Sequence, residues 1–245
     1  MPATASSATS GRLAGLTPLV AKSLVNQVVD AIVEAAAKGI FLPGDRIVEA
    51  ELARSLNVSR IPVREALRLL ESQGVVVSER YRGMRLMSVD IDRLEKILKV
   101  RLVLEKLAGA EVMARLKTEP DILGPLENVL AEMHKAARED DGYRVARLDT
   151  EFHQVLCALS GNEVLLHTFE QLSRQLTIIF GLSTMKKGVL SIVEEHDVVL
   201  DTLRSGDQTA FDELMQVHIL DYSRAVDYEH LVEQLRKLEG RRKSG

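Results

Sequence analysis

One stretch of this 245-residue chain decides how its N-terminal part folds: Asn57-Val58-Ser59-Arg60-Ile61-Pro62-Val63-Arg64-Glu65-Ala66-Leu67. Ser59 is a natural N-cap, and Pro62 falls in the first turn of the following helix, where its missing N–H costs little. Asn57 suits the left-handed conformation that follows a helix end. The stretch therefore predicts a helix over about 49–56, a very short turn, and a second helix from Ser59 to Glu71.

The segments around this helix-turn-helix predict a winged helix. A helix over 19–38 has apolar residues spaced by three or four, and Gly39 ends it. After Gly74 the sequence changes to a β-branched run, and a second run follows at residues 84–87. The two runs predict a hairpin with Gly83 in its turn. Three helices and a hairpin make a winged helix.

Cationic side chains gather on the second helix and on the hairpin. Arg64 and Arg68 point away from the apolar stripe of their helix, and Arg60 stands beside Ser59 at its N-terminal end. Such a helix is typical of major-groove reading, because arginine recognises guanine through two parallel hydrogen bonds. The arginines of the hairpin, Arg82 among them, suit the backbone phosphates. Each arginine taken singly also fits an ordinary solvated surface.

The rest of the chain predicts an all-α antiparallel helical bundle, so the expected fold class is mainly α. Aromatic residues make up only 4% of the chain and tryptophan is absent, which favours helices packed on helices over a β-sandwich. Gly, Pro, Asn and Asp residues supply stops and caps at the breaks. The expected helices are 91–117, 120–138, 142–159, 163–182, 189–204 and 208–235.

The distribution of charge predicts how the chain is divided. Residues 17–88 carry 10 Lys and Arg against 8 Asp and Glu, whereas residues 89–235 carry 16 against 27. The first segment tolerates DNA and the second repels it. We expect a disordered leader at 1–16, a DNA-binding domain at 17–88, a helical effector and dimerisation domain at 89–235, and a basic tail at 236–245.

Three features predict a cytoplasmic protein. The single cysteine, Cys157, excludes an internal disulfide and fits a reducing compartment. No apolar run is long enough to cross a membrane. The first residues lack the charged start and the apolar block of a secretion signal. We expect Cys157 to be a small buried apolar residue.

Four residues of the second half form a candidate metal site. Asp149 and His153 are four apart on one expected helix and share a face, while His196 and His218 lie on two later helices. Imidazole and carboxylate ligands suit a divalent transition metal (Zn, Ni, Mn or Fe) better than Ca or Mg. The spacing also occurs by chance, so separate structural roles stay open. The other histidines have no matching partner and are expected to be structural: His134, His167 and His230.

The N-terminal motif resembles the DNA-binding domain of GntR-family regulators. The resemblance implies that Arg60 and Arg64 contact bases and phosphates and that Gly83 is the wing glycine. Asn57 departs from the family's usual glycine, but asparagine tolerates the same left-handed conformation. The matching residues are Gly39 to Gly44, Glu51-Leu52-Ala53, residues 57–67 and Gly74.

Residues from about 91 to 228 resemble the FCD effector domain of the FadR subgroup. In metal-binding members the counterparts of the four candidate ligands hold an ion, which helps to hold a small carboxylate effector. Arg101 matches an arginine that pairs with this carboxylate, and Arg174 is a weaker candidate for the same role. A surface pair between Arg101 and Glu105 is the alternative. The matching residues are Arg101-Leu102-Val103-Leu104-Glu105, Asp149-Thr150-Glu151-Phe152-His153, Gly161-Asn162, Glu195-His196 and His218-Ile219.

Together these features predict a transcriptional regulator rather than an enzyme. We expect a homodimer on double-stranded operator DNA, controlled by a small organic acid bound at a metal site. One alternative is a metal-dependent enzyme with a DNA-binding module, in which Glu195 beside His196 is an available base. A second alternative is a DNA-binding protein whose helical half only dimerises.

Overall fold

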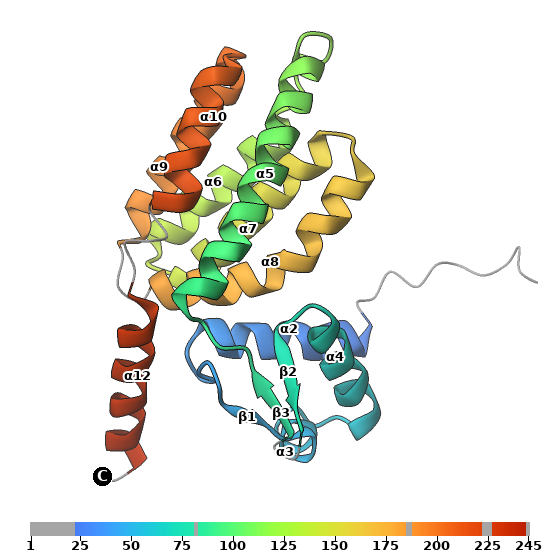
Figure 1. Cartoon of the computed structure of the whole chain (residues 1–245), viewed down its shortest axis with the longest axis vertical. Coiled ribbons are helices and arrows are strands. Elements are labelled where there is room, and N and C mark those ends of the chain that lie inside the picture. Colours follow the sequence, from blue (N-terminus) through green and yellow to red (C-terminus); the bar gives the residue numbers. More distant parts are fainter. Residues whose placement is uncertain (1–22, 81–82, 185–187, 222–226, 244–245) are drawn as a thin grey trace, which may run out of the picture.

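The computed structural model describes residues 23–80, 83–184, 188–221 and 227–243. The leader expected at 1–16 and the candidate Arg82 lie outside these ranges. Figure 1 shows short helices and a small sheet in the lower part of the view, a bundle of longer helices above them, and the C-terminal helix (red) beside them at the lower left. The expected fold class, a winged helix-turn-helix followed by an all-α bundle, is confirmed.

The lower part is a winged helix. Its strands form one antiparallel sheet in the order β1-β3-β2. The first strand was not predicted, because two residues are too short to show the alternation of a strand. The elements are α2 (Leu24–Ala37), β1 (Arg46–Ile47), α3 (Glu49–Ser55), α4 (Arg60–Ser72), β2 (Val76–Glu79) and β3 (Gly83–Leu86).

The tight turn between α3 and α4 has the predicted backbone. Asn57 lies in the left-handed region with φ 53°, as its residue type allows. Ser59 is the N-cap residue of α4, as predicted, although its side chain makes no cap hydrogen bond. The helix is fixed instead by its apolar face, which buries Val63, Ala66 and Leu67 against the domain core.

The upper part is a helical bundle in which three helices, α5, α7 and α10, begin at aspartate caps. Asp90, Asp141 and Asp207 each accept a hydrogen bond from the backbone N–H three residues later, which satisfies an orphan donor of the helix start. The elements are α5 (Ile91–Leu116), α6 (Gly124–Arg138), α7 (Gly142–Leu159), α8 (Glu163–Thr184), α9 (Val189–Ser205), α10 (Gln208–Gln216), the π-helix η1 (Val217–Asp221) and α12 (Tyr228–Lys243).

The last helix is not the single helix expected over 208–235. It ends at Gln216 and passes into the π-helix η1, and α12 begins beyond residues 222–226, which are not described. A π-turn adds a residue per turn and so changes the face that following residues present, which apolar spacing alone does not reveal. The stretch expected as a basic tail from 236 is helical as far as Lys243.

The two parts are in close contact through α2 and α8. A Cβ atom built on Gly181 of α8 would lie 2.6 Å from the Cβ of Ala37 in α2, so only glycine allows this approach. A second link runs from α12, where Arg236 donates to the Asp45 carboxylate (2.8 Å) and to the Pro43 carbonyl (2.6 Å). None of the described helices combines the length and the apolar character that spanning a membrane requires.

Candidate metal centre and DNA-reading surface

The outer face of α4 carries the residues predicted to read DNA. Ser59, Arg60, Arg64 and Arg68 are all exposed. Arg64 forms a two-bond pair with Glu49 at the start of α3, through Nε (3.1 Å) and Nη2 (2.9 Å). The hydrogen bond from Arg64 lowers the pKa of Glu49 against the opposing effect of burial, and the charge of the arginine lowers it further.

The other arginine on this face is also paired with a carboxylate. Arg68 Nη1 lies 2.9 Å from Glu65 Oε1, one turn away on the same helix. Ile61, which follows Arg60 at the start of α4, is 72% exposed, so this apolar side chain does not belong to the buried face of the helix. The exposed surface of α4 therefore combines two paired arginines, an arginine at the helix start and an apolar side chain.

Two residues of the wing have different structural roles. Gly83 opens β3 with φ 80°, a left-handed conformation that favours glycine. Arg85 is turned toward the body of the domain, where Nη1 donates to the Gly44 carbonyl at 2.7 Å. Arg85 thus holds the sheet to the loop before β1 and is not directed outward as a hairpin arginine was expected to be.

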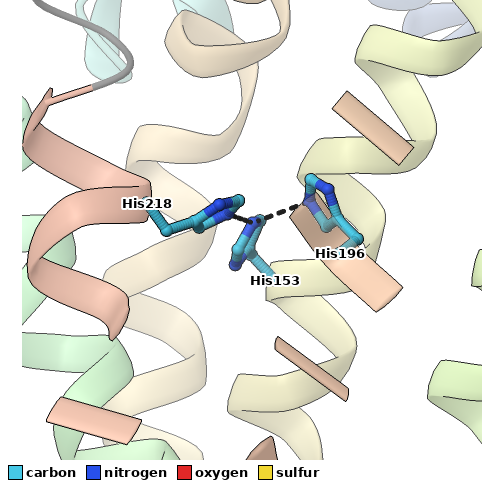
Figure 2. A group of neighbouring side chains, drawn as sticks. All are labelled: His153, His196 and His218. Carbon is cyan, nitrogen blue, oxygen red and sulfur yellow. Dashed lines mark hydrogen bonds between the residues drawn. The ribbon is translucent and has the colours of Figure 1, made fainter. Parts of the chain in front are cut away.

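The helical bundle brings three of the four candidate ligands, His153, His196 and His218, together at one buried point (Figure 2), and Asp149 contacts this cluster through His196. His153 of α7 is central: its Nε2 atom lies 3.1 Å from Nε2 of His196 in α9 and 3.2 Å from Nε2 of His218 in η1. Asp149 Oδ1 lies 3.2 Å from Nε2 of His196. Two ligand atoms that each lie about 2.1 Å from one ion are about 3.0–3.4 Å apart when their angle at the ion is between about 90° and 109°. The distances between the ring nitrogens fall in or near this range.

Protons alone cannot satisfy this chain of contacts. His196 Nδ1 lies 2.7 Å from the Ile192 carbonyl, which only accepts, so Nδ1 carries a proton. A ring nitrogen offers either one proton or one lone pair, and the Nε2 atoms of His153 and His196 each have two close neighbours. Three contacts therefore cannot all be hydrogen bonds, whereas one cation could interact with the three imidazole nitrogens at once. The donor set fits a divalent transition metal.

The charge states of the buried groups suit metal binding. Burial, followed by the nearby charge of Arg101, holds the pKa of His153 well below its usual value, so the ring is neutral. Burial opposes ionisation of Asp149, but its contact with His196 and the surrounding positive charge leave its pKa below the usual value. A neutral imidazole and an ionised carboxylate are the ligand forms that bind metals.

Glu105 of α5 is a buried neighbour that the sequence did not assign to the site. Its Oε2 atom lies 2.6 Å from His153 Nδ1, on the side of the ring that faces away from the other histidines, at angles outside those of a hydrogen bond. Carboxylates in this position orient metal-bound imidazoles. Burial raises the pKa of Glu105 against the opposing effect of Arg101. Its i,i+4 spacing from Arg101 was the only available signal.

Arg101 forms the predicted pair with Glu105, but the pair is buried rather than on the surface. The Nε–Oε1 distance is 2.6 Å, and the two side chains are 3% and 0% exposed. The guanidinium carbon lies 5.2 Å from the centre of the Phe180 ring in α8. Among the described residues, Arg101 Nη2 and Asp149 Oδ2 are buried without a hydrogen-bond partner.

The remaining candidates lie elsewhere. Arg174 lines a cleft between α2, α7 and α8 and donates to the Gln73 side chain at 2.6 Å, so it faces the winged helix. Cys157 is buried as expected, and burial raises the pKa of its thiol. His134 and His167 pair with surface carboxylates. His230 lies at the exposed start of α12 and contacts Gln234.

Comparison with protein families now identifies the chain. The gntR family of bacterial regulatory proteins matches residues 24–86, and the FCD domain matches residues 96–221. The chain belongs to the GntR family. Members of this family are transcriptional regulators, so the enzyme alternative is rejected.

Related proteins carry the same description. The chain is 31% identical to the HTH-type transcriptional regulator YdhC of Bacillus subtilis over 79% of this chain and 84% of that protein. It is 28% identical to the HTH-type transcriptional regulator LutR of Bacillus subtilis, over 74% and 91% of the two chains. It is 27% identical to a probable D-xylose utilization operon transcriptional repressor of Paenarthrobacter nicotinovorans, over 88% and 91%.

Solved structures share the fold. McbR/YncC of E. coli superposes with a TM-score of 0.68 at 23% identity, over 84% of this chain and all of that chain. A putative transcriptional regulator GntR from Rhodococcus sp. RHA1 gives a TM-score of 0.68 at 21% identity, over 83% and 97%. This GntR-family protein is therefore a transcriptional regulator with an FCD domain.

Proposed function

We propose that this GntR-family protein is a metabolite-responsive regulator whose operator affinity is set by a small organic acid bound at a metal ion. Asp149, His153, His196 and His218 would hold a divalent transition metal, Zn, Ni, Mn or Fe. One observation carries the proposal: three imidazole nitrogens from three helical elements converge inside the bundle at distances that protons cannot satisfy, and the Asp149 carboxylate lies 3.2 Å from one of them. When bound, the ion would supply a Lewis-acidic position open to an anionic ligand.

Arg101 is proposed to recognise the effector's carboxylate. Its Nη2 atom is buried and has no hydrogen-bond partner among the described residues, while Nε is held by Glu105. An unsatisfied buried donor is costly, and a planar guanidinium suits a carboxylate. The effector class that follows is a small organic acid. Arg174 faces the winged helix, so we assign it to communication between the domains instead.

The exposed face of α4 is proposed to read operator DNA. Ser59, Arg60, Arg64 and Arg68 would enter the major groove, where Arg64 would exchange its two-bond pair with Glu49 for base or phosphate contacts. Gly83, with Arg82 beside it in sequence, would bring the wing close to the phosphate backbone. Two copies of the chain would read a palindrome whose half-sites are about 34 Å apart.

Helix α8 is the proposed route between effector and DNA. Its Phe180 ring lies against the Arg101 guanidinium, and the next residue, Gly181, lies against Ala37 of the winged helix. Thr177 of α8 also donates to the hydroxyl of Thr150, which neighbours Asp149 in α7. A shift at the metal centre is therefore one contact away from the helix that touches the DNA-binding part.

The same helix holds the C-terminal end of the recognition helix. Gln175 Nε2 donates to the Gln73 carbonyl at 2.7 Å, and Arg174 Nη1 donates to the Gln73 side chain at 2.6 Å. Arg93 completes the connection by donating both to Gly74 O and to Gln175 Oε1 at 2.8 Å. Gln73 is the C-cap of α4, so a displacement of α8 would reorient the helix that reads DNA.

The test measures metal content, acid binding and operator binding in one protein. Operator DNA is first selected from a random pool, and anisotropy is then measured with and without a panel of small organic acids. We expect one bound divalent metal per chain and an acid that changes operator affinity by about 5- to 150-fold. Operator binding with no bound metal and no response to any acid would support a helical half that only dimerises.

A matched histidine variant separates the metal site from general damage. His153→Ala should remove both bound metal and acid response. His134→Ala changes a histidine of α6 whose Nε2 atom lies 3.0 Å from Asp197 on the surface, and it should retain both. Equal metal content in the two variants would contradict the ligand assignment.

A further inference from the structure

Ile61 is an apolar residue on the exposed face of the recognition helix α4. Its side chain is 72% exposed, whereas the next two residues, Pro62 and Val63, are buried in the domain. The core of the winged helix is therefore complete without Ile61. Single exposed apolar residues are common on protein surfaces, so the significance of this one depends on where it lies.

Ile61 shares a helix face with the two paired arginines of α4. Arg64 and Arg68 follow it by three and seven residues, which places the three side chains on one side of the helix. Ile61 is also the second residue of α4, and the N-terminal residues of a recognition helix are the ones that contact base edges in the major groove. An apolar side chain thus lies at the end of the helix that meets the bases.

The side chains on this face differ in how they are held. Arg64 is bonded to Glu49 and Arg68 to Glu65, both at 2.9 Å, and these carboxylates compete with DNA for the arginines. An isoleucine side chain makes no such bond, and its branched Cβ restricts Ile61 to few rotamers in a helix. A rigid side chain loses little conformational entropy on binding, so Ile61 is preorganised for contact.

Thymine is the base that offers an apolar group in the major groove. Adenine, guanine and cytosine present hydrogen-bond donors and acceptors there, whereas thymine also presents its C5-methyl group. An isoleucine placed against a donor or acceptor would displace water without replacing its hydrogen bonds, which is costly. Placed against a methyl group, the same side chain removes apolar surface from water. The chemistry of isoleucine at this position therefore favours thymine.

We propose that Ile61 reads a thymine in each half-site of the operator through the C5-methyl group of that base. This inference rests on the proposed function, in which the exposed face of α4 reads DNA. It adds a base that the arginines do not select, because the two parallel hydrogen bonds of an arginine recognise guanine. A guanine read by Arg60 or Arg64 would lie within a few base pairs of this thymine, since the three residues share the first two turns of α4.

The test removes the methyl group from the DNA and leaves the protein unchanged. Full-length protein selects an operator from a random pool, and each thymine of one half-site is then replaced singly by deoxyuridine. This replacement deletes the methyl group and keeps both the base pair and the O4 acceptor. At one thymine the affinity should fall by about 3- to 5-fold, the effect of one buried methyl group. Fluorescence anisotropy at fixed salt concentration gives each affinity.

A matched pair of variants assigns the methyl contact to Ile61. Ile61→Ala should bind the thymine and deoxyuridine operators equally, because the side chain that touches the methyl group is gone. Since Ile61 is exposed, the variant should unfold at the same temperature as the wild type. Ile40→Ala makes the same change at an isoleucine that is 66% exposed and close in sequence to Ala37, which lies against the bundle. It should keep the wild-type preference for thymine.

The outcomes separate this inference from the proposed function. A selected operator whose affinity no deoxyuridine replacement changes, or one without thymine in its half-sites, would overturn the reading by Ile61 while DNA binding stands. An Ile61→Ala protein that keeps the full preference for thymine would also overturn it. Loss of the acid response in a protein whose operator binding depends on the methyl group would overturn only the effector part of the proposed function.

Discussion

Two arginine–glutamate pairs, one in each half of the protein, have the same chemistry and opposite surroundings. Arg64 and Glu49 pair on the DNA-reading surface with side chains 54% and 30% exposed. Arg101 and Glu105 pair inside the bundle at 3% and 0% exposure. Water screens the first pair, so its partners can separate at little cost. The second pair has lost its water, so removing one partner leaves a buried charge.

The difference explains how each pair could work. An exposed pair that opens easily keeps Arg64 oriented while leaving it available to another anion, such as a phosphate or a base edge. A buried pair that cannot open fixes the Arg101 Nε atom, while Nη2 is buried without a hydrogen-bond partner and is available to a ligand. The first arrangement suits exchange of partners, and the second suits preorganised recognition.

The largest expected effect comes from breaking the buried pair. Arg101→Met should lower the free energy of unfolding by about 3–5 kcal/mol, because Glu105 is then buried without its partner. Urea denaturation of the metal-free protein measures the change. Arg204→Met, at an exposed arginine paired with Glu127 and Asp201, serves as the control and should unfold close to the wild type. Equal midpoints for the two variants would show that the Arg101 pair is hydrated.

The next effect concerns the ion that the buried site is proposed to hold. His153→Ala removes the histidine that contacts both other rings, so metal affinity should fall by about 100-fold or more. Competition with a chromogenic chelator gives the affinity. Operator binding in the absence of acid should change much less. A metal affinity unchanged within a factor of three would contradict a site built on this residue.

A smaller effect is expected at the exposed pair of Arg64 and Glu49. Arg64→Ala should weaken binding to a selected operator by about 10- to 100-fold, because a two-bond contact to DNA is lost. Fluorescence anisotropy at fixed salt concentration measures it, since phosphate contacts make the affinity salt-dependent. Arg204→Ala removes an equally exposed arginine from the helical half and should bind like the wild type. Similar losses in both variants would indicate a general charge effect.

The smallest effect is expected when the carboxylate partner of Arg64 is removed and Arg64 itself is retained. Glu49→Gln removes the carboxylate that competes with DNA for this arginine, so operator affinity should rise by about 2- to 5-fold. The matched change Glu127→Gln, at another exposed glutamate bonded to an arginine, should have no effect on DNA binding. Weaker binding by Glu49→Gln would instead mean that the pair orients Arg64 for DNA.

The local elements were largely predictable because their signals are local. The turn at Asn57 and the helix ends at Gly39 and Gly206 follow from residue types that adopt the left-handed conformation. The apolar stripe of α4 predicted which of its faces is buried. The π-helix and the two-residue strand β1 were missed, because neither leaves a periodic pattern in the sequence.

The candidate metal site shows the limit of sequence reasoning. Spacing placed Asp149 and His153 on one face, His196 and His218 on later helices were candidates by residue type, and the family resemblance supported all four. Glu105 was read only as a surface partner of Arg101, since i,i+4 spacing does not show whether a face points inward.

The sequence by itself determined the winged helix, the helical second half and the residue types that can read DNA or bind a metal, since propensities, caps and helix periodicity act between near neighbours. Tertiary structure alone decided that the Arg101 pair is buried, that three imidazoles meet at one point and that α8 holds the end of α4. The histidine contacts join residues 43 and 65 positions apart, and the bond from α8 to the end of α4 joins residues 102 positions apart. Packing of the whole bundle sets such distances, because no local preference reaches across them.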